Sequence, residues 1–215
     1  MNFLYKILKW KKKETIASDS TLMKNDDFVQ MKMNHGTHNA RSLLDQFLLD
    51  EIDYMTYVER QYACSNSVVR QNSADFIHHK HKYLRLLNLA LESEDDLKSD
   101  VIIEQMEVDA PAFLNELNQL LIDPRHQSHQ IVAKMLQDDA PSPTTVPYVR
   151  VVLESDFSYL AYTCSEKCAI AKWFSHLLFA IGTKEAIDLI REYAKCKDAQ
   201  IAQEMQYRLK QHNLV

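Results

Sequence analysis

The chain has 215 residues, of which 46% are hydrophobic and 26% are charged, so it is long enough and apolar enough to bury a globular core. Only two glycines occur, Gly36 and Gly182, which argues against a sheet-rich fold because sheets use glycine at turns and bulges. The net charge is −5, and since residues 1–13 contain five lysines and no acid, the remainder carries −10. An acidic body argues against nucleic acid as the main partner, because phosphate contacts need a basic surface. We therefore predict an all-α protein with a partner other than nucleic acid.

Neither export nor membrane insertion is indicated by the sequence. The basic run near the N-terminus follows the apolar start instead of preceding it, and no run of 18 apolar residues exists. The cysteines also lack the spacing of a secreted disulfide framework; they are Cys64, Cys164, Cys168 and Cys196. We therefore expect a cytoplasmic protein.

Residues 1–38 form a first region, with an amphipathic basic start and an irregular linker. Apolar side chains in residues 1–13 (MNFLYKILKWKKK) fall at helical spacing among the lysines. They indicate either a helix on an anionic membrane surface or a short segment that packs on its own domain or stays free. Residues 14–38 are polar and show no period.

Residues 39–110 form a second region, which we expect to be an N-terminal long helical hairpin. Apolar residues from Leu43 to Val58 recur at spacings of three and four, which predicts one long helix. A second helical run extends from Val68 to Leu91 and stops in an acidic cluster, residues 92–96. Two such helices joined by a short loop pack antiparallel, and a shorter helix over residues 97–106 follows them.

Residues 111–215 form a third, more regular region, which we expect to be continuous with residues 39–110 in one domain. Helical runs lie near 111–122, 126–138, 144–160, 166–181, 184–196 and 199–211, and prolines or Gly182 separate several of them. Similar segments, such as 131–135 and 170–174, lie about 40 residues apart, the period of helical-hairpin repeats. Each hairpin leaves an apolar face exposed, so neighbouring hairpins stabilise one another by stacking.

One stretch of this third region resembles a HEAT repeat. Residues 180–190 read Ala-Ile-Gly-Thr-Lys-Glu-Ala-Ile-Asp-Leu-Ile, and a helical run from Asp198 to Leu209 follows. In HEAT repeats a small and an aliphatic residue likewise precede Gly-Thr, and a helix with an Ala-x-x-Leu pattern follows. The resemblance covers residues 166–211 well and residues 124–160 less closely. It implies an α-solenoid of HEAT-like helical hairpins, and a scaffold of this kind implies no activity by itself.

A looser resemblance carries more functional content. The succession of Asp-Pro at 123–124, Thr-Val-Pro at 145–147, Tyr-Leu-Ala-Tyr at 159–162 and Lys-Cys at 167–168 is similar to small bacterial HEAT-repeat proteins. Several of these resemble immunity proteins, which neutralise a toxin delivered between competing cells. The resemblance implies a protein-binding inhibitor that occludes the active site of a basic toxin domain. A general HEAT-repeat scaffold or adaptor is the alternative that the same pattern supports.

Acidic and aromatic residues around 124–160 are the candidate partner-binding residues. Three tyrosines and Phe157 are expected to be exposed aromatic anchors, and acidic residues flank them. Together they describe a binding patch for a basic protein. Alternatively, the tyrosines belong to the core and the acids form a solvated rim. The candidates are Asp138, Asp139, Tyr148, Glu154, Asp156, Tyr159 and Tyr162.

Catalysis and metal binding have less support in the sequence. Two histidine groups, His78/His79/His81 and His126/His129, could supply four metal ligands, but the first lies in a basic stretch. The second lies at a helix start, where structural histidines cap and pack against Tyr148 or the previous helix. HEAT enzymes that hydroxylate lysine with two irons carry His-Glu dipeptides, and this chain has none. Phosphate-binding glycine loops are also absent. We expect no enzyme activity, no metal and no cofactor; a HEAT-type lyase or metal-dependent enzyme is the remaining alternative.

Overall fold

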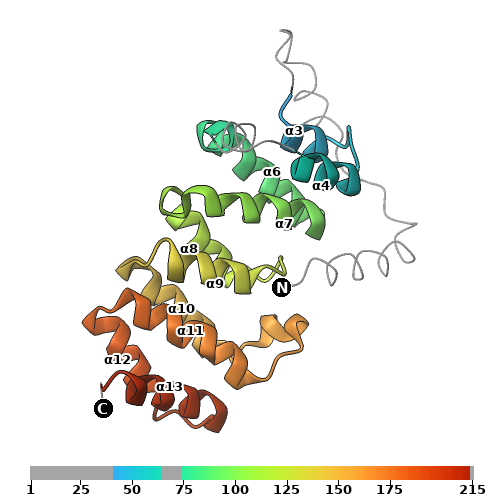
Figure 1. The fold of residues 1–215 in the computed structure, drawn as a ribbon. Helices are drawn as coiled ribbons and strands as arrows, with labels where there is room; N and C mark the ends of the chain where they lie inside the picture. The colour runs from blue at the N-terminus through green and yellow to red at the C-terminus, as the bar shows by residue number, and fades with distance from the viewer. Residues whose placement is uncertain (1–40, 64–73, 214–215) are drawn as a thin grey trace. The chain divides into compact units, whose positions relative to one another are not determined.

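The fold was analysed in a computed structural model that describes residues 41–63 and 74–213. All regular structure within these residues is helical, and none of them lies in a strand, which confirms the all-α prediction (Figure 1). The predicted basic start and linker, residues 1–38, lie outside the described residues.

Short helices follow one another along the described chain, with 3-10 turns (η) between some of them. Their bounds are α3 (Leu43–Leu48), α4 (Tyr54–Ala63), α6 (Lys80–Glu92), α7 (Asp96–Gln105), η1 (Met106–Phe113), α8 (Leu114–Ile122), α9 (His129–Asp138), η2 (Pro143–Thr145), α10 (Val146–Glu154), η3 (Ser158–Thr163), α11 (Lys167–Ile181), α12 (Lys184–Tyr193) and α13 (Ala199–Gln211).

The single long helix predicted from Leu43 to Val58 is wrong, because the chain forms two short helices there. Asp50 adopts a left-handed conformation with φ 59°, which no α-helix accommodates. The Asp53 carboxylate then accepts a hydrogen bond from the Thr56 N–H at 2.7 Å and starts α4. Phe47 of α3 stacks on Tyr57 of α4 with ring centroids 5.0 Å apart, so the apolar pattern continues across the break.

The second predicted long helix is also interrupted. Residues 74–78 are helical, His79 forms a turn, and α6 begins at Lys80. Val68 and Val69 lie outside the described residues. The end of α6 agrees with the prediction, since the helix stops at Glu92 and Asp95 caps α7 by accepting a hydrogen bond from the Lys98 N–H at 3.1 Å. The predicted long N-terminal hairpin is therefore replaced by shorter helices.

Helices in the third region agree better with their predicted ranges, and two differences have local causes. The helix predicted from residue 111 begins at Leu114, because η1 precedes it and the backbone angles of Asp109 are not helical. The helix predicted to reach residue 160 ends at Glu154, because Asp156 and Phe157 are both left-handed, with φ 54° and 60°. η3 follows this break.

The core is formed where each helix packs on the next one or the one after it. α8 contacts α9 and α10, α9 contacts α11, α10 contacts α12, and α11 contacts α12 and α13. Aromatic rings join the earlier helices to this core, since Phe76 stacks on Tyr83 at 4.7 Å and contacts Phe113 at 5.3 Å. All three rings are fully buried.

Candidate functional site

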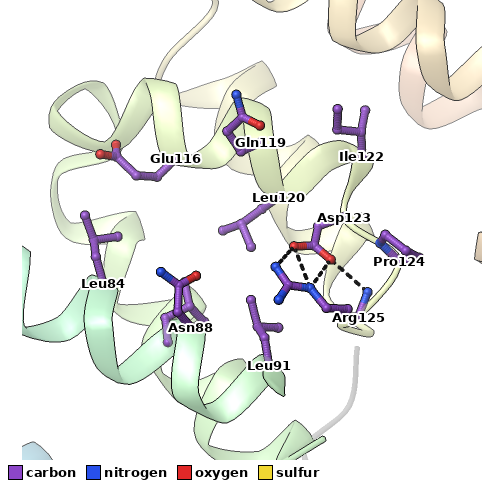
Figure 2. Close-up of a pocket in the computed structure, with 11 residues that line it drawn as sticks. Leu84, Asn88, Leu91, Glu116, Gln119, Leu120, Ile122, Asp123, Pro124 and Arg125 are labelled. Atoms are coloured by element: carbon purple, nitrogen blue, oxygen red, sulfur yellow. Dashed lines mark hydrogen bonds and ion pairs between the residues drawn. The ribbon is translucent and has the colours of Figure 1, made fainter. Parts of the chain in front are cut away.

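A groove of about 550 Å³ opens between α6, α8 and the segment that follows α8 (Figure 2). Each helix contributes residues at spacings of three, four and seven, the pattern of a single helical face. From α6 the lining residues are Leu84, Leu87, Asn88 and Leu91; from α8 and the following segment they are Glu116, Gln119, Leu120, Ile122, Asp123, Pro124 and Arg125.

The floor of the groove is aliphatic and its edges are polar. Leu87, Leu91 and Leu120 are buried at the base, while Leu84 and Ile122 are half-buried beside them. Asn88 and Gln119 are exposed, one on each helix. The Gln119 side-chain amide donates a hydrogen bond to the Tyr148 hydroxyl at 3.1 Å, which joins the α8 wall to α10. The groove therefore has an apolar base with hydrogen-bonding groups at its rim.

Ion pairs lie at both ends of the groove. At one end the Lys80 ammonium lies 3.0 Å from the Glu116 carboxylate. At the other end Arg125 donates hydrogen bonds to both oxygens of Asp123, with Nη2 2.6 Å from Oδ2 (Figure 2). The Arg125 hydrogen bond holds the pKa of the Asp123 carboxyl below its usual value, so this carboxylate stays ionised.

A pair of buried histidines supports the α8 wall from behind. The His126 Nε2 lies 2.6 Å from the Leu120 carbonyl oxygen, and the His129 Nε2 lies 2.9 Å from the Asp123 carbonyl oxygen. Leu120 and Asp123 both line the groove. The two imidazole rings stack on each other with centroids 4.0 Å apart. The Leu120 carbonyl also accepts a hydrogen bond from the Asp123 N–H, so the His126 ring adds a second contact there, and the His129 ring contacts the carbonyl of the residue that follows α8.

The hydrogen bonds of His126 require the neutral imidazole, and those of His129 are compatible with it. Nε2 of each ring faces a carbonyl and must donate, while the His126 Nδ1 accepts from the Ser128 N–H at 3.0 Å. The His129 Nδ1 faces the Tyr162 hydroxyl at 3.1 Å. Burial lowers the pKa of both rings, and burial together with the neighbouring His126 lowers the pKa of His129 to about 3. The interpretation of structural histidines that pack on the previous helix therefore fits, because the two rings contact Leu120 and Asp123 at the end of α8.

The two histidine groups do not meet in one metal site. His78, His79 and His81 are exposed near the start of α6, whereas His126 and His129 are buried behind α8. Within residues 41–63 and 74–213, no three histidine, cysteine, aspartate or glutamate side chains are grouped as metal ligands.

The acidic members of the predicted partner-binding set are exposed at helix ends. Asp138 and Asp139 lie at the end of α9, where Asp138 pairs with Lys134. Glu154 lies at the end of α10. Asp156 lies in the loop that follows and pairs with Lys167, the first residue of α11. Their exposure agrees with a binding surface and equally with a solvated rim.

The aromatic members do not form the exposed anchors that the sequence suggested. Phe157 is 3% exposed, so its assignment as an exposed aromatic is wrong. The Tyr159 hydroxyl donates to the Leu121 carbonyl at 3.3 Å, and Tyr162 contacts His129. Burial raises the pKa of both tyrosines to about 12. The side chains of Tyr148, Tyr159 and Tyr162 are half-buried.

Members of the predicted set lie near both ends of α9. Tyr162 contacts His129 at the start of α9, and Asp138 lies nine residues further along that helix. At 1.5 Å per residue this separates them by about 14 Å along the helix axis.

The groove residues were not singled out from the sequence. Their spacing of three, four and seven residues can be seen in the sequence of both helices. A half-polar helical face cannot be distinguished from an ordinary exposed surface, however, until the neighbouring helix is known.

Comparison of the chain with protein-family models, with curated proteins and with solved structures finds no match. Among the described residues, no helix has both the length and the apolar character that crossing a bilayer requires.

Proposed function

We propose that the chain is a protein-binding inhibitor, an immunity protein that neutralises a basic toxin domain in the cytoplasm by covering its active site. The observation that carries this proposal is the groove between α6 and α8, with its aliphatic floor and polar rim. A concave apolar surface edged with polar groups is typical of recognition sites. The described residues contain 26 acidic and 17 basic side chains, a net charge of −9, which favours a basic partner.

Binding has more support than catalysis because the titratable groups at the groove already have partners. Glu116 pairs with Lys80 and Asp123 with Arg125. The nearby His126 and His129 rings use their nitrogens in structural hydrogen bonds. A general acid or base needs a proton-transfer atom within reach of a substrate. In the described structure both carboxylates are held in ion pairs and both imidazole rings are buried.

We also propose that the helices from α8 onwards stack as HEAT-like hairpins in an α-solenoid. The contacts of α8 with α10, α9 with α11, α10 with α12 and α11 with α13 support this arrangement, since stacked hairpins bring every second helix together. Such a scaffold serves an adaptor as well as an inhibitor. The two functions differ in outcome, because only an inhibitor abolishes the activity of its partner.

The test combines the purified chain with the product of the gene adjacent to its own. Size-exclusion chromatography with light scattering would show a one-to-one complex, and the enzymatic activity of the toxin domain would fall to background at equimolar amounts. A bovine serum albumin control measures unspecific effects. Full toxin activity in the presence of a saturating amount of the chain would overturn the inhibitor proposal, and a stable complex with full activity would favour the adaptor.

A further inference from the structure

The dimensions of the groove between α6 and α8 suit a short helix. Its lining residues extend from Leu84 to Leu91 on α6 and from Glu116 on α8 to Asp123 directly after it, and the ends of each range are seven residues apart. At 1.5 Å per residue each wall is about 10 Å long, the length of about two helical turns. A helix of this length presents two or three side chains on one face, at spacings of three and four residues.

The backbone of the walls also favours a helical occupant. Both walls are α-helices, whose backbone groups bond within the helix, so the groove offers no open strand edge. An extended segment would place its own N–H and C=O groups over Leu87, Leu91 and Leu120 without partners, and burying such groups unpaired is unfavourable. A helix satisfies its backbone internally and avoids this cost.

Charge at the Leu91 end of the groove favours a cationic residue on the occupant. Glu92 and Glu94 directly follow Leu91, and both side chains are exposed. The hydrogen bond to Asp123 and the negative charge of Glu92 both raise the pKa of Arg125. Glu92 is therefore close enough to interact electrostatically with this end of the groove. Asp123 and Arg125 neutralise each other in their ion pair, so Glu92 adds a negative charge at this end. A lysine or arginine would be attracted, and a carboxylate repelled.

We propose that the groove between α6 and α8 binds a short amphipathic helix of the partner protein. Two or three aliphatic side chains of that helix lie on the leucine floor, and a lysine or arginine at one of its ends lies beside Glu92. Asn88 and Gln119 border the helix on its two sides. This inference rests on the proposed protein-binding function and adds the surface and the chemistry of the recognised segment.

A synthetic peptide probe tests the inference without the toxin. The peptide is a helix of about three turns with leucines spaced three and four residues apart and lysines elsewhere, and its twin carries glutamate at every lysine position. Fluorescence anisotropy would show binding of the lysine peptide to the intact chain and affinity at least about tenfold weaker for the glutamate twin. Equal affinity of the two peptides, or no binding of the lysine peptide, would overturn the inference.

A blocking variant locates the site. Asn88→Trp fills the groove from an exposed position and is expected to weaken peptide binding at least about tenfold, equivalent to 1.4 kcal/mol. Gln203→Trp is the matched control, because Gln203 is exposed on α13 and does not line the groove. Circular dichroism checks that both variants fold. Glu92→Lys, a surface change, provides a second measurement if Asn88→Trp unfolds, and it is expected to weaken binding as well. Unchanged peptide affinity in a folded variant would overturn the inference.

The remaining outcomes separate this inference from the proposed function. If Asn88→Trp abolishes a concentration-dependent dimer of the chain, the groove binds a second copy and the partner helix is overturned. If the toxin is not inhibited but the peptide binds as expected, the inhibitor proposal fails and the groove inference stands. If Asn88→Trp inhibits the toxin as well as the unmodified chain does, the groove inference fails and the inhibitor proposal stands.

Discussion

At the scale of single residues, the buried histidine pair decides the geometry of the α8 wall. His129 donates to the Asp123 carbonyl through Nε2, receives the Tyr162 hydroxyl at Nδ1 and stacks on His126. The charged groups around the pair are held by its sequence neighbours. Gln127 donates a hydrogen bond to Asp96, Ser128 donates one to Asp100, and Arg125 pairs with Asp123. Protonation would place a donor at Nδ1, opposite the Tyr162 hydroxyl, and a charge in a buried site.

Stability is therefore expected to fall on acidification. The pKa of His129 is about 3 in the folded chain and about 6.5 in the unfolded chain, so below about pH 6.5 the unfolded state binds more protons. The stability contribution is complete above about pH 6.5 and is lost progressively as the pH falls toward about 3. Between about pH 7.5 and 5.5 the free energy of unfolding should fall by about 1.4 kcal/mol from His129 alone.

Urea denaturation at the two pH values measures this decrease. His129→Gln is the comparison, since its amide keeps a donor near the Nε2 position and does not titrate. The pH-dependent decrease should be smaller in this variant by about the same amount. An identical pH dependence in both proteins would exclude His129 as the titrating group.

At the scale of elements, helix ends are set by local backbone conformation and by caps. Gly182 ends α11 in the left-handed region at φ 66°, and Thr183 then caps α12 by accepting a hydrogen bond from the Ala186 N–H. The left-handed residue Asp50 interrupts one helix that was predicted too long, and Asp156 and Phe157 interrupt another. Glycine is recognisable as a helix end in a sequence, whereas aspartate and phenylalanine in this conformation are not.

Replacement of Gly182 tests the cap between α11 and α12. A Cβ atom at this position would meet the Phe179 carbonyl oxygen at 3.6 Å, an ordinary contact, so the cost of Gly182→Ala is conformational. We expect the free energy of unfolding to fall by about 1–2 kcal/mol. Gly182→Asn should lose less, because asparagine tolerates the left-handed region. Thermal and urea denaturation compare the three proteins, and an alanine variant as stable as the original chain would contradict the cap assignment.

At the scale of the whole molecule, the excess of acidic over basic side chains bears on how a partner approaches. Many of the acids take part in surface ion pairs, such as the contact of Arg150 with Glu192 at 2.9 Å, and pairs of this kind contribute little to stability. The net charge of −9 on the described residues remains after pairing and acts beyond contact distance.

Association with a basic partner should therefore depend on ionic strength. We expect the association rate constant to fall at least about tenfold when NaCl is raised from about 50 mM to about 500 mM, with a smaller change in the dissociation rate. Stopped-flow fluorescence with the toxin domain measures both. An association rate that does not respond to salt would mean that the acidic surface has no part in the encounter.

Local physics determined much of this protein from its sequence alone. The scarcity of glycine predicted an all-helical chain, and helical periodicity with prolines and Gly182 placed most helix ends after residue 110 close to their observed positions. Only the tertiary structure decided which faces are covered. Phe157 and Tyr162 pack inward, the two histidines stack, and Leu84 and Leu120 come to line one groove. Periodicity shows that a helix has an apolar face, but burial depends on the helix that packs against it, and that helix comes from a distant part of the chain.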